Sequence, residues 1–323
     1  MINNLLLRTL GYIVGFSVSI LSSTIKELPP FIKEGTSYQS ALDCYPLIAI
    51  TCHYNPERLE CLEKVLQTLK TFPKADIVLL TNTGRKRKTK EIEECYKKVF
   101  PAVIENKTVS MRTCPDLMHP IELTWSHKQL IKDEFLDPQK GYTHFIYLED
   151  DIALDFDNFC YFVHARDVLK EKRLIPSFLR VETNNRNQIV SSSSAYKIAV
   201  NKHPQAPYRH LLFLNLNDPF CACYILDKEL AEEYSNSPSF DLKNSSKVCS
   251  WGIRMRAGMG LCFENIPSPF YHRFVIPLDV DRLTCPFYAQ VSHIPSSLAR
   301  TSSNLDHKIP VDSLFYFTQK GEK

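Results

Sequence analysis

The chain has 323 residues, of which 44% are hydrophobic and 23% are charged, so it can bury a sizeable core as one large α/β unit or as two domains. Its net charge of +3 is too small to indicate a nucleic-acid partner, and its 9 glycines form neither a Walker A loop nor a dinucleotide-binding G-x-G-x-x-G motif. The 11 cysteines include no C-x-x-C pair, which argues against a zinc ribbon and leaves disulfide pairing open.

The N-terminal segment Leu5–Ser23 is almost wholly apolar and is close to the roughly 20 residues that cross a bilayer. We expect residues 1–24 to form a single-pass membrane anchor, of the Golgi or ER type if the protein is eukaryotic. A cleaved signal peptide, which would give a soluble secreted form, and an apolar helix packed on the domain are the alternatives. Residues 25–44 carry prolines, charges and small polar side chains and are predicted to be a linker or stem, followed by a folded domain at 45–323.

From Pro46 the sequence alternates between two patterns. Short apolar runs predict strands at Pro46–Tyr54, Ala75–Asn82, Ala102–Val109 and Thr143–Asp151. Amphipathic patterns predict helices at Arg58–Phe72, Lys90–Phe100 and Glu122–Leu136. The basic run Gly84–Lys90 is predicted to be a solvated loop before the second helix. This alternation predicts an α/β fold with a mostly parallel central sheet, helices on both faces, and ligands at the carboxyl ends of the strands.

The fourth predicted strand ends in three consecutive carboxylates, Glu149, Asp150 and Asp151. Neighbouring negative charges repel, and each one that leaves water costs several kcal/mol unless something neutralises it. A divalent cation would neutralise them. Because the triplet lies at the carboxyl end of a strand, it predicts a ligand site.

Three kinds of chemistry use carboxylates at such a place. An aspartyl-phosphate phosphatase needs Asp-x-Asp-x-Thr near its first strand, and the triplet here comes at the fourth strand with no threonine after it. A glycoside hydrolase needs two carboxyl groups at a separation that sequence does not reveal. A nucleotide-sugar site uses an acidic motif to bind manganese or magnesium, which bridges the donor's two phosphates. A metal-dependent phosphohydrolase or nucleotidyltransferase is a further rival.

The strand that ends in Leu-Glu-Asp-Asp resembles that of glycosyltransferases with the GT-A fold, whose Asp-x-Asp motif is often varied to Glu-x-Asp or Glu-Asp-Asp. The string LEDDI is similar to the motif of the lipooligosaccharide glycosyltransferase type. The resemblance extends from Pro46 to about Phe317 and implies a Rossmann-like GT-A domain. It further implies metal-dependent transfer of a sugar from a nucleoside diphosphate, with UDP expected, to a glycan or lipid-linked acceptor.

The resemblance also implies roles for individual residues. Glu149 and Asp151 take the outer positions of the motif as metal ligands, with Glu149 also facing the ribose, and a late histidine, His293, is the third ligand to Mn2+ or Mg2+. His53 and His119 compete for that role, and a lone histidine is more often a surface or core residue. The residues expected to bind the nucleotide sugar are Thr51, His53, Tyr54, Arg58, Asn82, Glu149, Asp150 and Arg254.

Two segments of the second half read as strands with one carboxylate each: Ser177–Thr183 carries Glu182, and Asn217–Leu226 carries Asp218. Either is a candidate catalytic base for an inverting reaction, with a purely structural carboxylate as the alternative.

The segment Lys247–Leu261 is predicted to be a helix that carries Trp251, Arg254 and Arg256. An arginine there would hold the donor diphosphate, and Trp251 would stack on a sugar or lie in the core. Many inverting GT-A enzymes carry an acidic residue in this region, and this helix has none. This difference leaves the identity of the catalytic base and the stereochemical outcome open. It also permits a second hypothesis, a non-catalytic GT-A-like domain that binds carbohydrate or serves as a scaffold.

Overall fold

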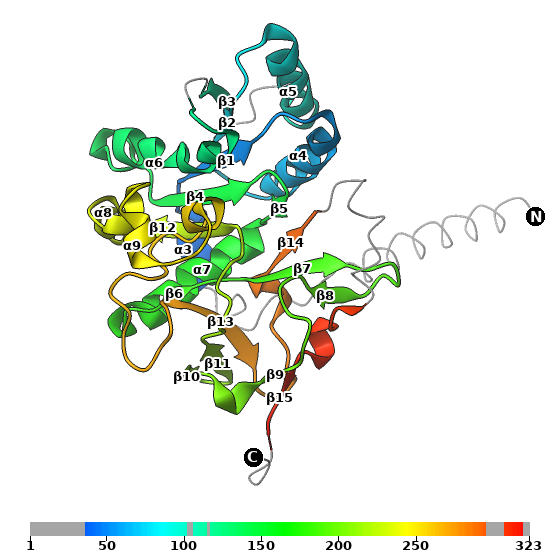
Figure 1. The fold of residues 1–323 in the computed structure, drawn as a ribbon, viewed down its shortest axis with the longest axis vertical. Helices are drawn as coiled ribbons and strands as arrows, with labels where there is room; N and C mark the ends of the chain where they lie inside the picture. The colour runs from blue at the N-terminus through cyan, green and yellow to red at the C-terminus, as the bar shows by residue number, and fades with distance from the viewer. Residues whose placement is uncertain (1–35, 102–105, 115–116, 295–306, 319–323) are drawn as a thin grey trace, which may run out of the picture. The chain divides into compact units, whose positions relative to one another are not determined.

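The computed structural model describes residues 36–101, 106–114, 117–294 and 307–318 (Figure 1). Contacts divide the chain into two units, Met1–Gln39 and Ser40–Lys323, and the description below concerns the second. The predicted anchor lies outside the described residues, as does the predicted linker up to helix α3 (Thr36–Leu42). Within the described ranges, no helix is both long and apolar enough to cross a membrane.

A five-stranded sheet forms the centre of this unit, in the order β12-β4-β1-β2-β3. The strands are β1 (Pro46–Cys52), β2 (Ala75–Thr81), β3 (Lys107–Thr113), β4 (His144–Glu149) and β12 (Cys223–Asp227). β1 pairs in parallel with β2 and β4, and β2 pairs in parallel with β3, whereas β12 runs antiparallel to β4. All seven residues of β1 are buried, as expected for a strand covered on both faces.

The helices that surround this sheet lie between and after its strands (Figure 1). They are α4 (Pro56–Leu69), α5 (Lys86–Val99), α6 (His127–Leu130), α7 (Phe156–Leu169), α8 (Lys228–Ser235), α9 (Ser245–Val248) and α10 (Ile253–Ala257). A 3-10 helix, η1 (Pro120–Trp125), precedes α6, and a π-helix, η2 (Ile131–Phe135), follows it.

Ring contacts of β4 show which face each helix covers. Tyr147 packs on His127 of α6, with ring centroids 4.1 Å apart. His144 instead packs edge-on against Phe159 of α7 at 5.0 Å. Because strand residues an odd number of positions apart point to opposite faces, α6 and α7 cover opposite faces of the sheet. Phe72, just after α4, contacts Phe159 as well, so the end of α4 lies on the α7 side.

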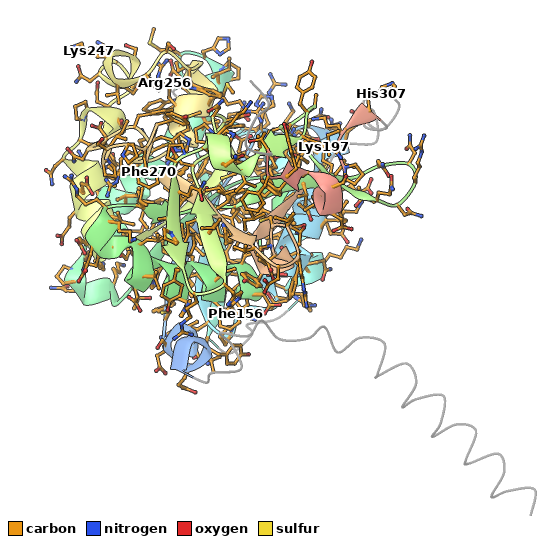
Figure 2. All side chains as sticks on the ribbon, turned by 90° about the horizontal axis from the view of Figure 1, so that it is seen from below. Phe156, Lys197, Lys247, Arg256, Phe270 and His307 are labelled. Carbon is orange, nitrogen blue, oxygen red and sulfur yellow. The ribbon has the colours of Figure 1, made fainter. Side chains whose placement is uncertain are left out.

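Smaller sheets complete the unit. One has the order β5-β14-β7-β8, with β5 (Ile152–Ala153), β14 (Gln290–His293), β7 (Leu179–Thr183) and β8 (Ile189–Ser191). Another has the order β10-β11-β13-β6, with β10 (Gln205–Tyr208), β11 (Leu211–Leu214), β13 (Phe274–Asp279) and β6 (Ile175–Pro176). The third pairs β15 (Phe315–Tyr316) with β9 (Ile198–Ala199). Figure 2 shows side chains filling the space between these layers, with Lys247 at the margin of the view.

The structure confirms the predicted α/β class and a sheet that is mostly parallel, and it corrects several element boundaries. The basic run predicted as a loop enters α5 at Lys86, because lysine and arginine are good helix formers and no breaker follows Gly84. The helix predicted at Glu122–Leu136 is divided among η1, α6 and η2. The third strand is shifted towards its C-terminus, to Lys107–Thr113, and residues 102–105 lie outside the described ranges.

Two predictions in the second half also change. The helix predicted at Lys247–Leu261 breaks into α9 and α10, because the backbone is extended at Cys249, with φ of −150° and ψ of 155°, and α10 begins only after Gly252. The strand predicted at Asn217–Leu226 is regular only from Cys223, because Asp218 and Pro219 precede it in an irregular turn. No disulfide joins the cysteines, all of which lie within the described ranges.

Candidate functional site

The acidic triplet lies at the carboxyl end of β4. Glu149 is the last residue of that strand, and Asp150 and Asp151 form the turn into β5. The three residues are only 3%, 2% and 5% exposed. Three carboxylates buried this deeply must be neutralised by neighbouring groups. The surrounding elements supply two guanidinium groups and one imidazole.

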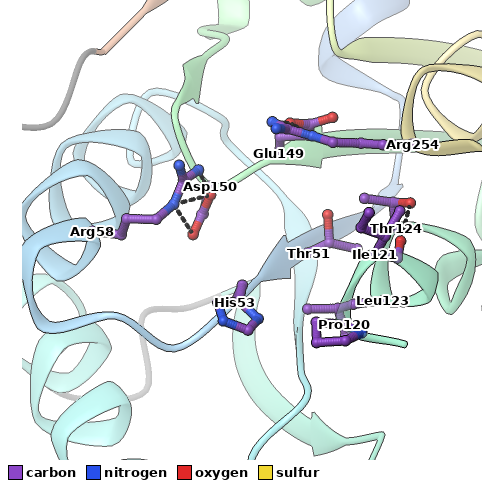
Figure 3. Close-up of a pocket in the computed structure, with 10 residues that line it drawn as sticks. All are labelled: Thr51, His53, Arg58, Pro120, Ile121, Leu123, Thr124, Glu149, Asp150 and Arg254. Atoms are coloured by element: carbon purple, nitrogen blue, oxygen red, sulfur yellow. Dashed lines mark hydrogen bonds and ion pairs between the residues drawn. The ribbon is translucent and has the colours of Figure 1, made fainter. Parts of the chain in front are cut away.

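Arg58 neutralises the second and third carboxylates. It lies in the first turn of α4, just after the carboxyl end of β1. Its Nε lies 3.1 Å from both carboxylate oxygens of Asp150 (Figure 3). Its Nη2 lies 2.9 Å from Oδ2 of Asp151. Such a charge-assisted fork holds both partners in one geometry. Arg58 is therefore part of the site and not a solvated charge on the helix surface.

Arg254 neutralises the first carboxylate. It lies in the short helix α10 and donates from Nε to Oε2 of Glu149 at 3.2 Å (Figure 3). The other carboxylate oxygen of Glu149, Oε1, is buried and has no hydrogen-bond partner in the part of the chain that the structure describes. A buried oxygen without a partner is costly, so this atom is available to a bound ligand.

A third positive group comes from the C-terminal part of the chain. Nε2 of His293 lies 3.5 Å from Oδ2 of Asp151, and its Nδ1 lies 3.1 Å from Oε1 of Glu182. The small sheet creates this arrangement, because β14 pairs with β5, directly after the triplet, and with β7, which carries Glu182. The backbone N–H of Ile294 also donates to the Asp151 carbonyl at 2.7 Å.

The pKa values reflect these contacts. Burial raises the pKa of Glu149 and of Asp150, although an arginine beside each opposes the shift. Burial also acts to raise the pKa of Asp151, but the hydrogen bond from His293 and the charge of Arg58 outweigh it and lower that pKa to about 2. The same contacts overcome the effect of burial on His293 and raise its pKa to about 9. At neutral pH His293 is therefore a cation between two carboxylates.

A cavity of about 280 Å³ opens in front of Glu149 and Asp150, whereas Asp151 and His293 do not line it. One side is charged and carries Glu149, Asp150 and both arginines, and the other side is the largely apolar surface of η1 (Figure 3). The residues that line it are Thr51, His53, Arg58, Pro120, Ile121, Leu123, Thr124, Glu149, Asp150 and Arg254. A cavity with a charged and an apolar half suits a ligand that has a charged and an apolar part.

The structure brings most of the predicted donor-binding residues together but not all of them. Of the eight expected to bind the nucleotide sugar, two do not line the cavity. Tyr54 donates its hydroxyl to Glu91 of α5. Asn82 keeps a buried Oδ1 without a hydrogen-bond partner in the described ranges. His119, a competing metal ligand, instead accepts the backbone N–H of Ile121 at the start of η1, at 3.1 Å.

The two candidate bases have different surroundings. Glu182 contacts His293, so it is placed to orient that ring. Asp218 is exposed, accepts the backbone N–H of Phe220 at 3.0 Å, and faces two other cavities. Neither lines the cavity in front of the triplet.

Sequence reasoning missed the apolar wall. Pro120, Ile121 and Leu123 belong to a segment whose pattern gives only an amphipathic helix, and no motif marks the residues that face a ligand. The wall is fixed by a contact that is remote in sequence: the indole N–H of Trp125 donates to the Ile253 carbonyl at 2.9 Å, which ties η1 to the helix of Arg254. Trp251 does not line this cavity.

The donor set of the site fits a hard divalent cation with few protein ligands. The Asp151 oxygen and the His293 nitrogen converge, and Glu182 behind the imidazole is the partner that metal-bound histidines commonly have. A metal would bind there by displacing the proton that His293 carries at neutral pH. Among the described residues, no group of three or more His, Cys, Asp or Glu side chains is arranged to hold a metal ion. Mn2+ or Mg2+ at this place would therefore need diphosphate oxygens and water to complete its coordination.

A scan of the chain against models of known protein families finds no match, and neither does a search of curated protein sequences.

Proposed function

We propose that the chain is a metal-dependent glycosyltransferase of the GT-A type, which transfers a sugar from a nucleoside diphosphate, with UDP expected, to a glycan or lipid-linked acceptor. One observation carries the proposal: a buried acidic triplet at a strand end, two arginines and a cavity with an apolar wall occur together. The charged half of the cavity suits a diphosphate and the apolar half suits a nucleobase.

The chain's own residues would divide the work. Arg58 and Arg254 line the cavity, and a diphosphate entering it would accept hydrogen bonds from guanidinium N–H groups while the carboxylates keep their ion pairs. Asp151 and His293 would hold Mn2+ or Mg2+, with Glu182 fixing the imidazole. Glu149 would offer its unpartnered oxygen to the donor. The metal, when bound, would stabilise the negative charge of the departing diphosphate.

The acceptor would approach from the side of Asp218. Of the two candidate bases, Asp218 fits that role better, because Glu182 is already paired with His293. Oδ2 of Asp218 has no hydrogen-bond partner in the described ranges, so it is open to an acceptor hydroxyl.

The test is a screen of UDP-sugars with the purified protein and Mn2+, with the released products identified. Release of UDP and free sugar supports the transferase. Release of UMP and a sugar 1-phosphate would show a phosphohydrolase instead, because a different bond is cut. Asp151→Ala is the control that should abolish release and leave the far-UV circular dichroism unchanged.

A second candidate is a non-catalytic domain that binds the nucleotide sugar or a carbohydrate. The observation in its favour is that α10 carries Arg254 and Arg256 but no carboxylate, and that neither candidate base lines the donor cavity. UDP binding without turnover of any donor would establish this alternative. Absence of any UDP binding, with or without Mn2+, would overturn both the transferase and a domain that binds the nucleotide sugar.

We also propose that the protein is attached to a membrane through its N-terminus. The apolar run Leu5–Ser23 would anchor the chain in a membrane, so that the catalytic unit works on one side of it. That run lies outside the described residues, and the proposal for it depends on the sequence alone.

A further inference from the structure

A second cavity, of about 370 Å³, shares no lining residue with the first. We call it the Tyr196 cavity. The residues of it that matter below are Ser194, Tyr196, Lys197, Lys202, Asp218 and Tyr316. The C-terminal strand β15 helps to form it, because Phe315 pairs with Ile198 of β9 and the next residue, Tyr316, lines the cavity.

The Tyr196 cavity has an excess of positive charge. Two ammonium groups, Lys197 and Lys202, line it together with one carboxylate, Asp218. Both lysines are exposed, and neither forms an ion pair with any residue that the structure describes. Lys197 directly precedes β9, and Lys202 is the last residue of the 3-10 turn that follows this strand, so the two lysines lie at opposite ends of one short segment. A ligand with one negative charge would neutralise the excess.

The same cavity presents aromatic rings and hydroxyl groups. Tyr196 is 82% exposed and Tyr316 is 39% exposed. The turn around Ser194 holds Tyr196 outward: the Ser194 hydroxyl donates to the Tyr196 carbonyl at 2.6 Å and accepts the Tyr196 N–H at 3.3 Å. An exposed aromatic ring beside hydroxyl and amide groups suits a ligand that has an apolar face and polar edges. A pyranose ring is such a ligand.

We propose that the Tyr196 cavity binds a sugar that carries a carboxylate, that is, a hexuronic acid unit. Tyr196 would contact the ring face, Lys197 and Lys202 would bind the carboxylate, and Asp218 would accept a hydroxyl. The cavity continues towards β7, because Ser193, Leu216 and Asp218 also line the small neighbouring cavity that includes Arg180 of that strand. If the proposed transferase function holds, this sugar belongs to the acceptor; the binding itself does not depend on that function.

Saturation-transfer NMR with methyl glucuronide and methyl glucoside tests the proposal on the full chain. The two ligands differ only in the carboxylate. We expect the glucuronide to bind at least ~10-fold more tightly, because a hydrogen bond to a charged group typically contributes more than 1.4 kcal/mol. The K197Q/K202Q double variant should lose this preference and keep its fold, since both side chains are exposed. Lys247→Gln is the matched control, an exposed lysine well separated from Lys197 in Figure 2.

Two further measurements test which groups bind the ligand. Tyr196→Ala should weaken the binding of both ligands, because it removes the ring contact that they share. Methyl glucoside 6-sulfate should bind no better than the glucuronide; a clear preference for the sulfate would overturn the assignment of a carboxylate.

Equal binding of glucuronide and glucoside by the wild-type protein, or a preference that survives in the double variant, would overturn the proposal, as would the absence of binding by either ligand. This outcome is separable from the failure of the transferase proposal, which is measured by UDP release at the first cavity. Each result can occur without the other.

Discussion

His293 lies between two carboxylates: its Nδ1 is 3.1 Å from Oε1 of Glu182, and its Nε2 is 3.5 Å from Oδ2 of Asp151. Nε2, on the Asp151 side, is the nitrogen that a metal would use, and Glu182 fixes the ring from behind. The sequence offered Glu182 as a catalytic base. The structure instead favours Glu182 as a residue that positions His293, and this difference leads to the first prediction.

Replacing Glu182 with Ala should weaken Mn2+ binding in the presence of UDP by ~10–100-fold, because a metal-bound histidine depends on the partner of its other nitrogen. Glu182→Gln should have a smaller effect, since its amide oxygen can still accept from Nδ1. Titration calorimetry with Mn2+ measures both. Glu94→Gln is the control, a glutamate whose side chain is 64% exposed in α5. Unchanged Mn2+ affinity in Glu182→Ala would show that His293 does not ligate the metal.

Replacing Arg58 with Ala should lower the free energy of unfolding by about 3–5 kcal/mol, because Asp150 would stay buried without its partner. Urea unfolding measures this. Arg87→Ala, which removes an 85% exposed side chain, should change stability by no more than about 0.5 kcal/mol.

Adding the substitution Asp150→Asn to the Arg58→Ala protein should restore much of the lost free energy of unfolding, since it removes the unpaired charge. The single variant Arg58→Lys should lose nearly as much free energy of unfolding as Arg58→Ala, because an ammonium group cannot reproduce the fork that reaches two carboxylates. A free energy of unfolding for Arg58→Ala close to the wild-type value would contradict the role given to this pair.

His144 should make stability depend on pH between 4 and 6.5. Burial lowers its pKa to about 4 in the folded protein, whereas the ordinary value is 6.5. Between these values the unfolded chain binds more protons than the folded protein does, so the free energy of unfolding rises with pH through this range. Above pH 6.5 the contribution of His144 is fully present. At 1.36 kcal/mol per pKa unit, the contribution is about 3 kcal/mol.

The measurement compares wild type with His144→Gln by urea unfolding at a series of pH values. Other titrating groups are common to both proteins, so their difference isolates His144. The difference should change by about 3 kcal/mol between pH 4 and 6.5 and be constant above that range. A difference that is independent of pH would show that His144 protonates normally in the folded state.

A chain that begins at Tyr38 should be soluble and should retain UDP binding. It keeps the whole unit from Ser40 to Lys323, including Ala41, which is 1% exposed and so belongs to the core. Gel filtration and UDP titration of this protein beside the full chain check the prediction. Aggregation of the shortened protein would mean that the apolar N-terminal segment is needed by the domain.

The sequence by itself determined the β-α-β order, the identity of β1, β2 and β4 as buried strands, and the place of the acidic triplet at a strand end. These features depend on short-range patterns, because periodicity and burial act over a few neighbouring residues. The predicted boundaries were wrong where a local change of backbone conformation decided them, as at Cys249, whose extended backbone ends α9 within a segment predicted to be one helix.

Only the tertiary structure decided how the triplet is neutralised and what faces it. Arg58 and Arg254 reach Asp150 and Glu149 across separations of 92 and 105 residues, and His293 reaches Glu182 across 111. Their meeting depends on sheet order and register, which no local pattern contains. The apolar wall of η1 is fixed in the same way, by one hydrogen bond from Trp125 to α10. Which side chain neutralises a charged residue therefore depends on the tertiary fold.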